Sequence, residues 1–140
     1  MIAIDSNVLL RYLLADDDLQ SRKASKLITG NSFVFLSHVV LVEAVWTLAG
    51  KKYKLPPKEI DLVITALFQE ENIVIQEAEV VWRALLDFRR YRIEGQEKID
   101  FADALILNQG KAAASDCGEP FDGFYTFDLA AQKLPGANAP

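Results

Sequence analysis

Cysteine and histidine are nearly missing from the 140-residue sequence, which holds one of each, Cys117 and His38. A single cysteine cannot form an intramolecular disulfide or supply the cysteine cluster of a zinc or iron–sulfur site. A single histidine likewise excludes a histidine-rich metal site, and it leaves a serine–histidine or cysteine–histidine nucleophile pair possible only through His38. Any catalytic chemistry is therefore expected to depend on carboxylates.

The sequence also lacks long hydrophobic runs and an excess of basic residues. No window reaches the roughly 18 uninterrupted apolar residues of a membrane-spanning helix, and the first residues do not have the pattern of a signal peptide. We therefore expect a soluble, cytoplasmic protein that binds no membrane. The net charge of −5 argues against a protein that binds nucleic acid through a broad positive face.

Apolar residues, by contrast, are abundant enough to form a core. Hydrophobic residues make up 51% of the sequence, and 140 residues is a usual length for one domain. No repeat, low-complexity tract or linker interrupts the chain. We predict a single domain over residues 1–134. The proline- and glycine-rich residues 135–140 are expected to form a flexible tail.

Short apolar runs alternate with helical segments along the chain. This order predicts an α/β fold with a central parallel sheet of four to five strands flanked by helices. The expected strands are residues 1–4, 33–36, 72–75 and 124–127. The expected helices lie at about 8–14, 16–29, 38–49, 58–69, 77–91 and 99–107.

Four of the 20 acidic residues stand in apolar surroundings rather than in turns or polar helix faces. Glu43 lies in a helix that is apolar almost all round, so we expect its carboxylate to be partly buried. Asp103 interrupts an apolar run in the same way. Asp5 and Asp128 each follow an apolar strand, and ligands bind at the carboxyl ends of strands in open parallel sheets. The four acids are therefore expected to form one site.

A cluster of four carboxylates is costly, because each ionised group loses hydration and repels the others. A divalent cation would offset this cost. Mg²⁺ and Mn²⁺ prefer oxygen ligands and are typically held by one or two carboxylates together with the phosphate oxygens of a substrate. The pattern favours one or two such ions and a phosphate-containing substrate.

The same acids have structural interpretations. Asp5 and Asp128 each precede a possible helix and could be N-caps, and Glu43 could form a buried salt bridge with an arginine. Asp100, one turn before Asp103, favours a helix N-cap. The joint occurrence of two strand-end aspartates and two isolated acids in apolar helices favours a functional role for the four over unrelated structural roles.

The contexts of these acids resemble those of PIN-domain ribonucleases, most closely the VapC-type toxins of toxin–antitoxin pairs. The resemblance covers nearly the whole chain and includes the Ile-Asp-Ser-Asn start at residues 4–7. Glu43 in Leu-Val-Glu, Asp103 in Phe-Ala-Asp-Ala and Asp128 in Thr-Phe-Asp follow in the order of the family. Ser6 stands where threonine is common, a departure that keeps the hydroxyl.

The resemblance implies a PIN-like fold and a metal-dependent endoribonuclease that hydrolyses RNA. It assigns catalysis to the four acids. Three of them, Asp5, Asp103 and Asp128, would bind one or two Mg²⁺ or Mn²⁺ ions. Glu43 would complete the site as a further ligand, or would orient or deprotonate the attacking water. Possible supporting residues are Asn7, Thr126 and Asp100.

The resemblance also implies partners, namely an RNA substrate, a cognate antitoxin and a second copy in a homodimer. The basic segments 51–54 and 89–92 are candidate contacts to the RNA backbone, although each closes a helix, where cations also complement the helix dipole. Two alternatives stay open, a non-catalytic PIN-like module that binds RNA or protein and a housekeeping RNA-processing nuclease. A phosphatase of the haloacid-dehalogenase type would need an aspartate where the sequence has Asn7.

Overall fold

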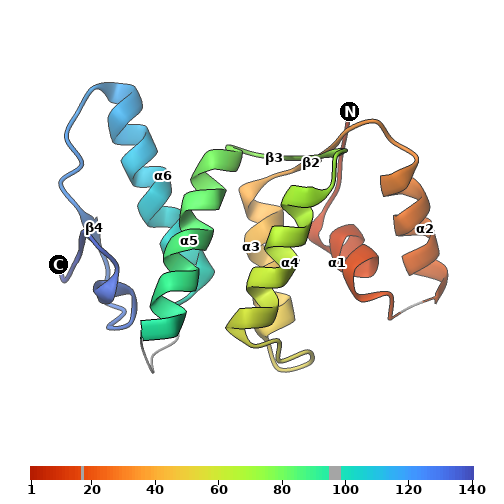
Figure 1. The fold of residues 1–140 in the computed structure, drawn as a ribbon, viewed down its shortest axis with the longest axis horizontal. Helices are drawn as coiled ribbons and strands as arrows, with labels where there is room; N and C mark the ends of the chain where they lie inside the picture. The colour runs from red at the N-terminus through yellow and green to blue at the C-terminus, as the bar shows by residue number, and fades with distance from the viewer. Residues whose placement is uncertain (17, 95–98) are drawn as a thin grey trace. The chain divides into compact units, whose positions relative to one another are not determined.

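The computed structural model of the protein describes residues 1–16, 18–94 and 99–140. It consists of two compact units, Met1–Gln76 and Glu77–Pro140, which we call the N-terminal and C-terminal units. Figure 1 labels their helices and strands. In the described ranges the N-terminal unit has four α-helices and a three-stranded sheet, and the C-terminal unit has two α-helices and a two-stranded sheet.

The sheet of the N-terminal unit is parallel, with the strand order β1-β2-β3. Its strands are β1 (Ile2–Ala3), β2 (Val34–Leu36) and β3 (Ile73–Ile75). Val34 and Leu36 on the central strand are completely buried. Buried parallel strands are typically such short apolar runs, because helices cover both faces of the sheet. The expected strands at 33–36 and 72–75 are thus confirmed, each one residue shorter.

Four helices surround this sheet: α1 (Ser6–Leu14), α2 (Asp18–Thr29), α3 (His38–Ala49) and α4 (Pro57–Gln69). Helix α1 packs against α2 and α3, and α3 also contacts α4. Their bounds follow local signals. The Ser37 hydroxyl accepts a hydrogen bond from the Val40 N–H at 3.3 Å and caps α3, as predicted. Pro57 occupies the first turn of α4, where its missing N–H costs no hydrogen bond. The fully buried side chains include Leu9, Ile28, Leu41, Leu48 and Ile64.

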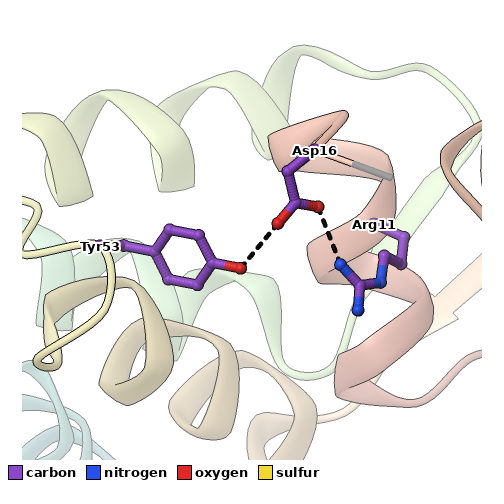
Figure 2. A network of polar contacts seen from close by, with 3 residues as sticks. All are labelled: Arg11, Asp16 and Tyr53. Carbon is purple, nitrogen blue, oxygen red and sulfur yellow. Dashed lines mark hydrogen bonds and ion pairs between the residues drawn. The ribbon is translucent and has the colours of Figure 1, made fainter. Parts of the chain in front are cut away.

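A polar network connects the loops at one end of the N-terminal unit. Figure 2 shows the Asp16 carboxylate between the Tyr53 hydroxyl, which donates at 2.8 Å, and the Arg11 guanidinium, at 2.9 Å. Arg11 lies on α1, and Tyr53 lies between α3 and α4. The Tyr53 hydrogen bond, followed by the contact with Arg11, lowers the pKa of Asp16 below its ordinary value. The ionised carboxylate therefore stabilises this arrangement of loops.

Tyr53→Phe is expected to raise the pKa of Asp16 toward its ordinary value. A lowered pKa in the folded state contributes stability above the ordinary pKa, and this contribution is lost as the pH falls through the folded pKa. The variant should therefore be slightly less stable than the wild type at neutral pH, and this pH-linked part of the difference should vanish in acid. Carbon-detected NMR titration measures the pKa of Asp16 in the variant and the wild type. Denaturant unfolding at neutral and at acid pH measures the difference in stability. An unchanged Asp16 titration would show that Tyr53 is not the cause.

Two packed helices form the core of the C-terminal unit. They are α5 (Ala78–Glu94) and α6 (Phe101–Cys117). Phe88 on α5 and Phe101 on α6 meet edge to face, with ring centroids 6.0 Å apart and an angle of 89° between the rings. Asn108 on α6 is also buried, and its amide donates to Asp87 at 2.8 Å and to the Ala104 carbonyl at 2.8 Å. Each buried polar group here has a partner, as a stable core requires.

Helix α6 continues ten residues beyond its predicted end at residue 107. Its second half is rich in alanine, at positions 112–114, and alanine is the best helix former. Gly118 ends it with a φ of 69°, a left-handed conformation that suits glycine. The predicted helix was defined by apolar periodicity. This periodicity stops before the helix ends, because the second half of α6 has few buried residues.

The end of the chain also differs from the prediction. The flexibility of residues 135–140 stays a prediction, but within them Ala137–Asn138 forms β5, which pairs in parallel with β4 (Phe124–Tyr125). The Phe124 N–H donates to the Gly136 carbonyl at 2.8 Å, and Gly136 adopts a φ of 92°. A short 3₁₀ helix, Ala131–Lys133, precedes this strand.

The predicted α/β class with parallel strands and flanking helices is confirmed. The five strands of the described chain divide into a three-stranded and a two-stranded sheet. The single domain over residues 1–134 stays a prediction. In the described ranges, none of the helices has the length and hydropathy needed to span a membrane.

Candidate active site

Asp5 lies two residues after the end of β1 and caps α1. Its Oδ1 accepts a hydrogen bond from the Val8 N–H at 2.9 Å, so the N-cap interpretation of this residue is correct. The side chain is exposed. Because the cap fixes one carboxylate oxygen, the carboxylate is held in one orientation at the carboxyl end of the strand. The capping role and a ligand role are compatible, since a carboxylate has a second oxygen.

Glu43 lies in the middle of α3 and meets the start of α1. The Ser6 hydroxyl donates to its Oε2 at 2.9 Å, which joins two residues 37 positions apart. Because Ser6 follows Asp5 directly in the sequence, this hydrogen bond holds Glu43 against the segment that contains Asp5. Sequence reasoning treated Ser6 only as a departure from threonine. The role of Ser6 could have been predicted from its position, because its hydroxyl stands beside a strand-end acid in the sequence.

The prediction that Glu43 is partly buried is wrong. Glu43 is exposed and shares its helix face with Val39 and Trp46, which are 67% and 54% exposed. The apolar composition of α3 therefore does not mean that every face of the helix is covered, since exposed apolar residues are common in proteins. The alternative interpretation, a buried salt bridge to an arginine, does not fit either, because the Glu43 carboxylate is exposed and accepts the Ser6 hydroxyl.

Asp103 lies in the first turn of α6 and is partly buried. Asp100, three residues earlier, caps this helix by accepting a hydrogen bond from the Ala102 N–H at 3.0 Å, as predicted. Burial first, then repulsion from Asp100 and Asp128, raises the pKa of Asp103 above its ordinary value. Within the described residues, no side chain or N–H group hydrogen-bonds the Asp103 carboxylate.

Asp128 follows β4 in the C-terminal unit and is also held by backbone groups. Its Oδ1 accepts hydrogen bonds from the N–H groups of Ala130 at 2.7 Å and Ala131 at 3.1 Å. The Thr126 hydroxyl accepts a hydrogen bond from the Asp128 N–H at 3.1 Å. The Asp128 carboxylate thus stabilises the turn that leads into the 3₁₀ helix, although the N-cap of that helix is Ala130, and Thr126 supports the position of the acid.

The structure thus brings the predicted acids together in two groups. We call Asp5 and Glu43 the N-terminal acids, and Asp100, Asp103 and Asp128 the C-terminal acids. Each group is positioned by helix caps and hydroxyl groups within its own unit.

The chain matches the PIN domain family over residues 2–122. It belongs to this family. PIN domains are generally nucleases, and they are usually metal-dependent ribonucleases. The matched segment includes Asp5, Glu43 and Asp103 and ends before Asp128. No match to the chain is found among curated proteins.

PIN-domain nucleases typically use Mg²⁺ or Mn²⁺, and the donor chemistry of the acids suits these ions, which prefer carboxylate oxygens. A bound cation would relieve the repulsion of Asp103 by Asp100 and Asp128. Over the ranges 1–16, 18–94 and 99–140, however, no three His, Cys, Asp or Glu side chains are close enough together to hold a metal ion. The assignment of metal ligands in this PIN domain stays a prediction.

The predicted supporting and RNA-contacting residues have different surroundings. Asn7 is exposed at the start of α1, and in the described part of the chain it makes no hydrogen bond to an acid. In the basic segment 51–54, the Lys52 ammonium lies 5.1 Å from the Tyr53 ring centroid. In the segment 89–92, Arg89 and Arg90 lie over aromatic rings at 5.8 Å and 5.9 Å, and the side chain of Arg92 lies outside the described residues.

Proposed function

We propose that the protein is a metal-dependent endoribonuclease that acts as the toxin of a VapC-type toxin–antitoxin pair. The observation that carries the proposal is Asp103, which is partly buried, repelled by two neighbouring carboxylates and without a hydrogen-bond donor in the described residues. A carboxylate in this state costs stability, and a metal site explains why it is present. Membership of the PIN domain family supports the same function.

In the proposed reaction, Asp5, Asp103 and Asp128 hold one or two Mg²⁺ or Mn²⁺ ions. When bound, such an ion makes a coordinated water more acidic and stabilises the charge on the leaving oxygen. Backbone hydrogen bonds fix one oxygen of Asp5 and one of Asp128, so each acid presents its other oxygen. Glu43, held by the Ser6 hydroxyl, completes the site as a ligand or as the group that orients or deprotonates the water.

RNA is the proposed substrate, because it supplies the phosphate oxygens that such a site binds. We further propose a cognate antitoxin as a partner, a homodimer as the assembly and the cytoplasm as the location. The resemblance of the four acid-containing segments to VapC-type toxins supports these proposals. The basic segments 51–54 and 89–92 are the proposed contacts to the RNA backbone.

The nuclease proposal is tested with purified protein and mixed RNA in Mg²⁺ or Mn²⁺, with and without EDTA. Cleavage is expected with either metal, and EDTA should abolish it. Asp5→Asn should also abolish cleavage without unfolding α1, because asparagine is as good an N-cap as aspartate. Asp18→Asn, an exposed aspartate at the start of α2, is the matched control and should cleave normally. Equal cleavage by Asp5→Asn and wild type would refute the site assignment.

The toxin role needs a separate test. Induced expression of the wild type in a bacterial host is expected to arrest growth, and Asp5→Asn should not. Normal growth in the presence of active nuclease would count against the toxin role and in favour of RNA processing.

A further inference from the structure

A pocket of about 320 Å³ lies between α1 and α2 and includes Asp5 in its lining. Both helices belong to the N-terminal unit and pack against each other, in red and orange in Figure 1. From α1 the pocket is lined by Asn7, Val8 and Arg11, and from α2 by residues that include Lys23 and Leu27. A predicted catalytic acid thus borders a cavity of the size that small-molecule sites have.

The charged side chains in the lining are the Asp5 carboxylate and the cations Arg11 and Lys23, and Lys23 is the cation that we assign to a phosphate. Arg11 is already paired with Asp16 at 2.9 Å, so most of its charge is compensated. Lys23 is exposed and forms no ion pair with any residue of the described ranges. An exposed ammonium in the wall of a pocket is suited to a phosphate group, which it binds as a point charge.

The rest of the lining suits a nucleobase. Val8, Ala24 and Leu27 provide an apolar wall, and Leu27 is 42% exposed although it is a large aliphatic residue. Asn7 is exposed beside them and carries both a hydrogen-bond donor and an acceptor. Protein sites for unpaired RNA bases combine these two features, an apolar surface against the face of the base and polar groups at its edge. The volume suits one nucleotide rather than a longer segment.

We propose that this pocket binds one nucleotide of the RNA next to the phosphate that is cleaved at Asp5. Lys23 contacts a phosphate of that nucleotide, and Leu27 packs against its base. The choice of RNA as the ligand rests on the ribonuclease function proposed above. The pocket would then determine which base is accepted beside the cleavage position.

The test uses NMR titration of the ¹⁵N-labelled full chain with AMP, GMP, CMP and UMP in EDTA, so that no cleavage is needed. We expect at least one nucleotide to shift the amides of α1 and α2 that line the pocket. Lys23→Gln should weaken its binding about fivefold to tenfold. Lys26→Gln is the matched control, because Lys26 is an exposed lysine on the same helix that does not line the pocket. Lys26→Gln should weaken nucleotide binding by less than twofold.

Two further probes separate the base from the phosphate. Inorganic phosphate and ribose 5-phosphate lack the base, so both should bind more weakly than the preferred nucleotide. Leu27→Ala should weaken nucleotide binding and leave inorganic phosphate binding unchanged. Circular dichroism and thermal unfolding verify that each variant is folded, which is expected because all three substituted side chains are exposed.

The proposal is overturned if the shifted amides lie elsewhere, if Lys23→Gln and Lys26→Gln weaken binding equally, or if inorganic phosphate binds as tightly as every nucleotide. Its failure is distinguishable from failure of the nuclease proposal. Nucleotide binding at the pocket without RNA cleavage supports the pocket and refutes the nuclease. RNA cleavage with no nucleotide-induced shift at the pocket refutes the pocket alone.

Discussion

Asp103→Asn is expected to lower the rate of RNA cleavage by at least about a hundredfold while leaving the free energy of unfolding unchanged or higher. The two effects have one cause. The wild-type carboxylate is partly buried and lies near two others, Asp100 and Asp128. A group that costs stability and is required for activity is typical of a functional site. The amide has nearly the same shape but no charge, so it removes the repulsion and the proposed metal ligand together.

The sign of the stability change depends on pH. Because the pKa of Asp103 is raised in the folded state, its contribution to stability is favourable only where the group is protonated. The destabilisation by the ionised carboxylate is absent below the ordinary pKa and complete above the raised pKa. The advantage of Asp103→Asn should therefore be present at neutral pH and disappear in acid. Urea unfolding in EDTA at both pH values measures this difference.

Asp122→Asn is the control for this comparison, since Asp122 is an exposed aspartate of the same unit outside the predicted site. It should change neither cleavage nor stability. In a site without function, Asp103→Asn would gain stability and keep its activity, if any is present. A variant that loses activity and stability together would instead show that Asp103 has a structural role, which would contradict the metal-ligand assignment.

The elements that were predicted correctly from the sequence depend on interactions between residues close together in the chain. Ser37 and Asp100 cap α3 and α6 as expected, because a side-chain oxygen before a helix accepts a hydrogen bond from the first turn whatever surrounds it. Buried parallel strands such as β2 are recognisable as apolar runs. At Asp5 and Asp128 both interpretations were open, and the structure shows a helix cap at Asp5 and backbone hydrogen bonds to a turn at Asp128. A cap does not exclude a ligand role, so these residues remain candidates for the metal site.

The features that the sequence analysis missed depend on distant parts of the chain. The exposure of Glu43 depends on which face of α3 is covered by α1 and α4, and an apolar sequence does not specify that face. Strand β5 forms only because β4 offers it a partner more than ten residues earlier. The pocket beside Asp5 depends on the packing of α2 against α1, which brings Lys23 and Leu27 to Val8. None of these contacts has a local sequence signal.

Phe101→Ala is expected to destabilise the protein by roughly 3–5 kcal/mol, the usual cost of removing a buried phenylalanine. Phe101 is 1% exposed and meets Phe88 edge to face. It follows the Asp100 cap directly and lies two residues before Asp103, so the same helix turn carries the core contact and the candidate acids. Since whole domains have only about 5–15 kcal/mol of stability, the variant should unfold at a much lower urea concentration.

Two variants identify the cause of this effect. Phe101→Leu keeps most of the apolar volume and should cost less than Phe101→Ala. Phe127→Ala removes the same side chain at a position that is 86% exposed and should change stability by no more than about 0.5 kcal/mol. If Phe101→Ala is as stable as Phe127→Ala, the core of the C-terminal unit is not built on the Phe88–Phe101 contact. If Phe101→Ala is folded under assay conditions yet cleaves RNA more slowly, this packing also positions Asp103, because the two residues share the first turn of α6.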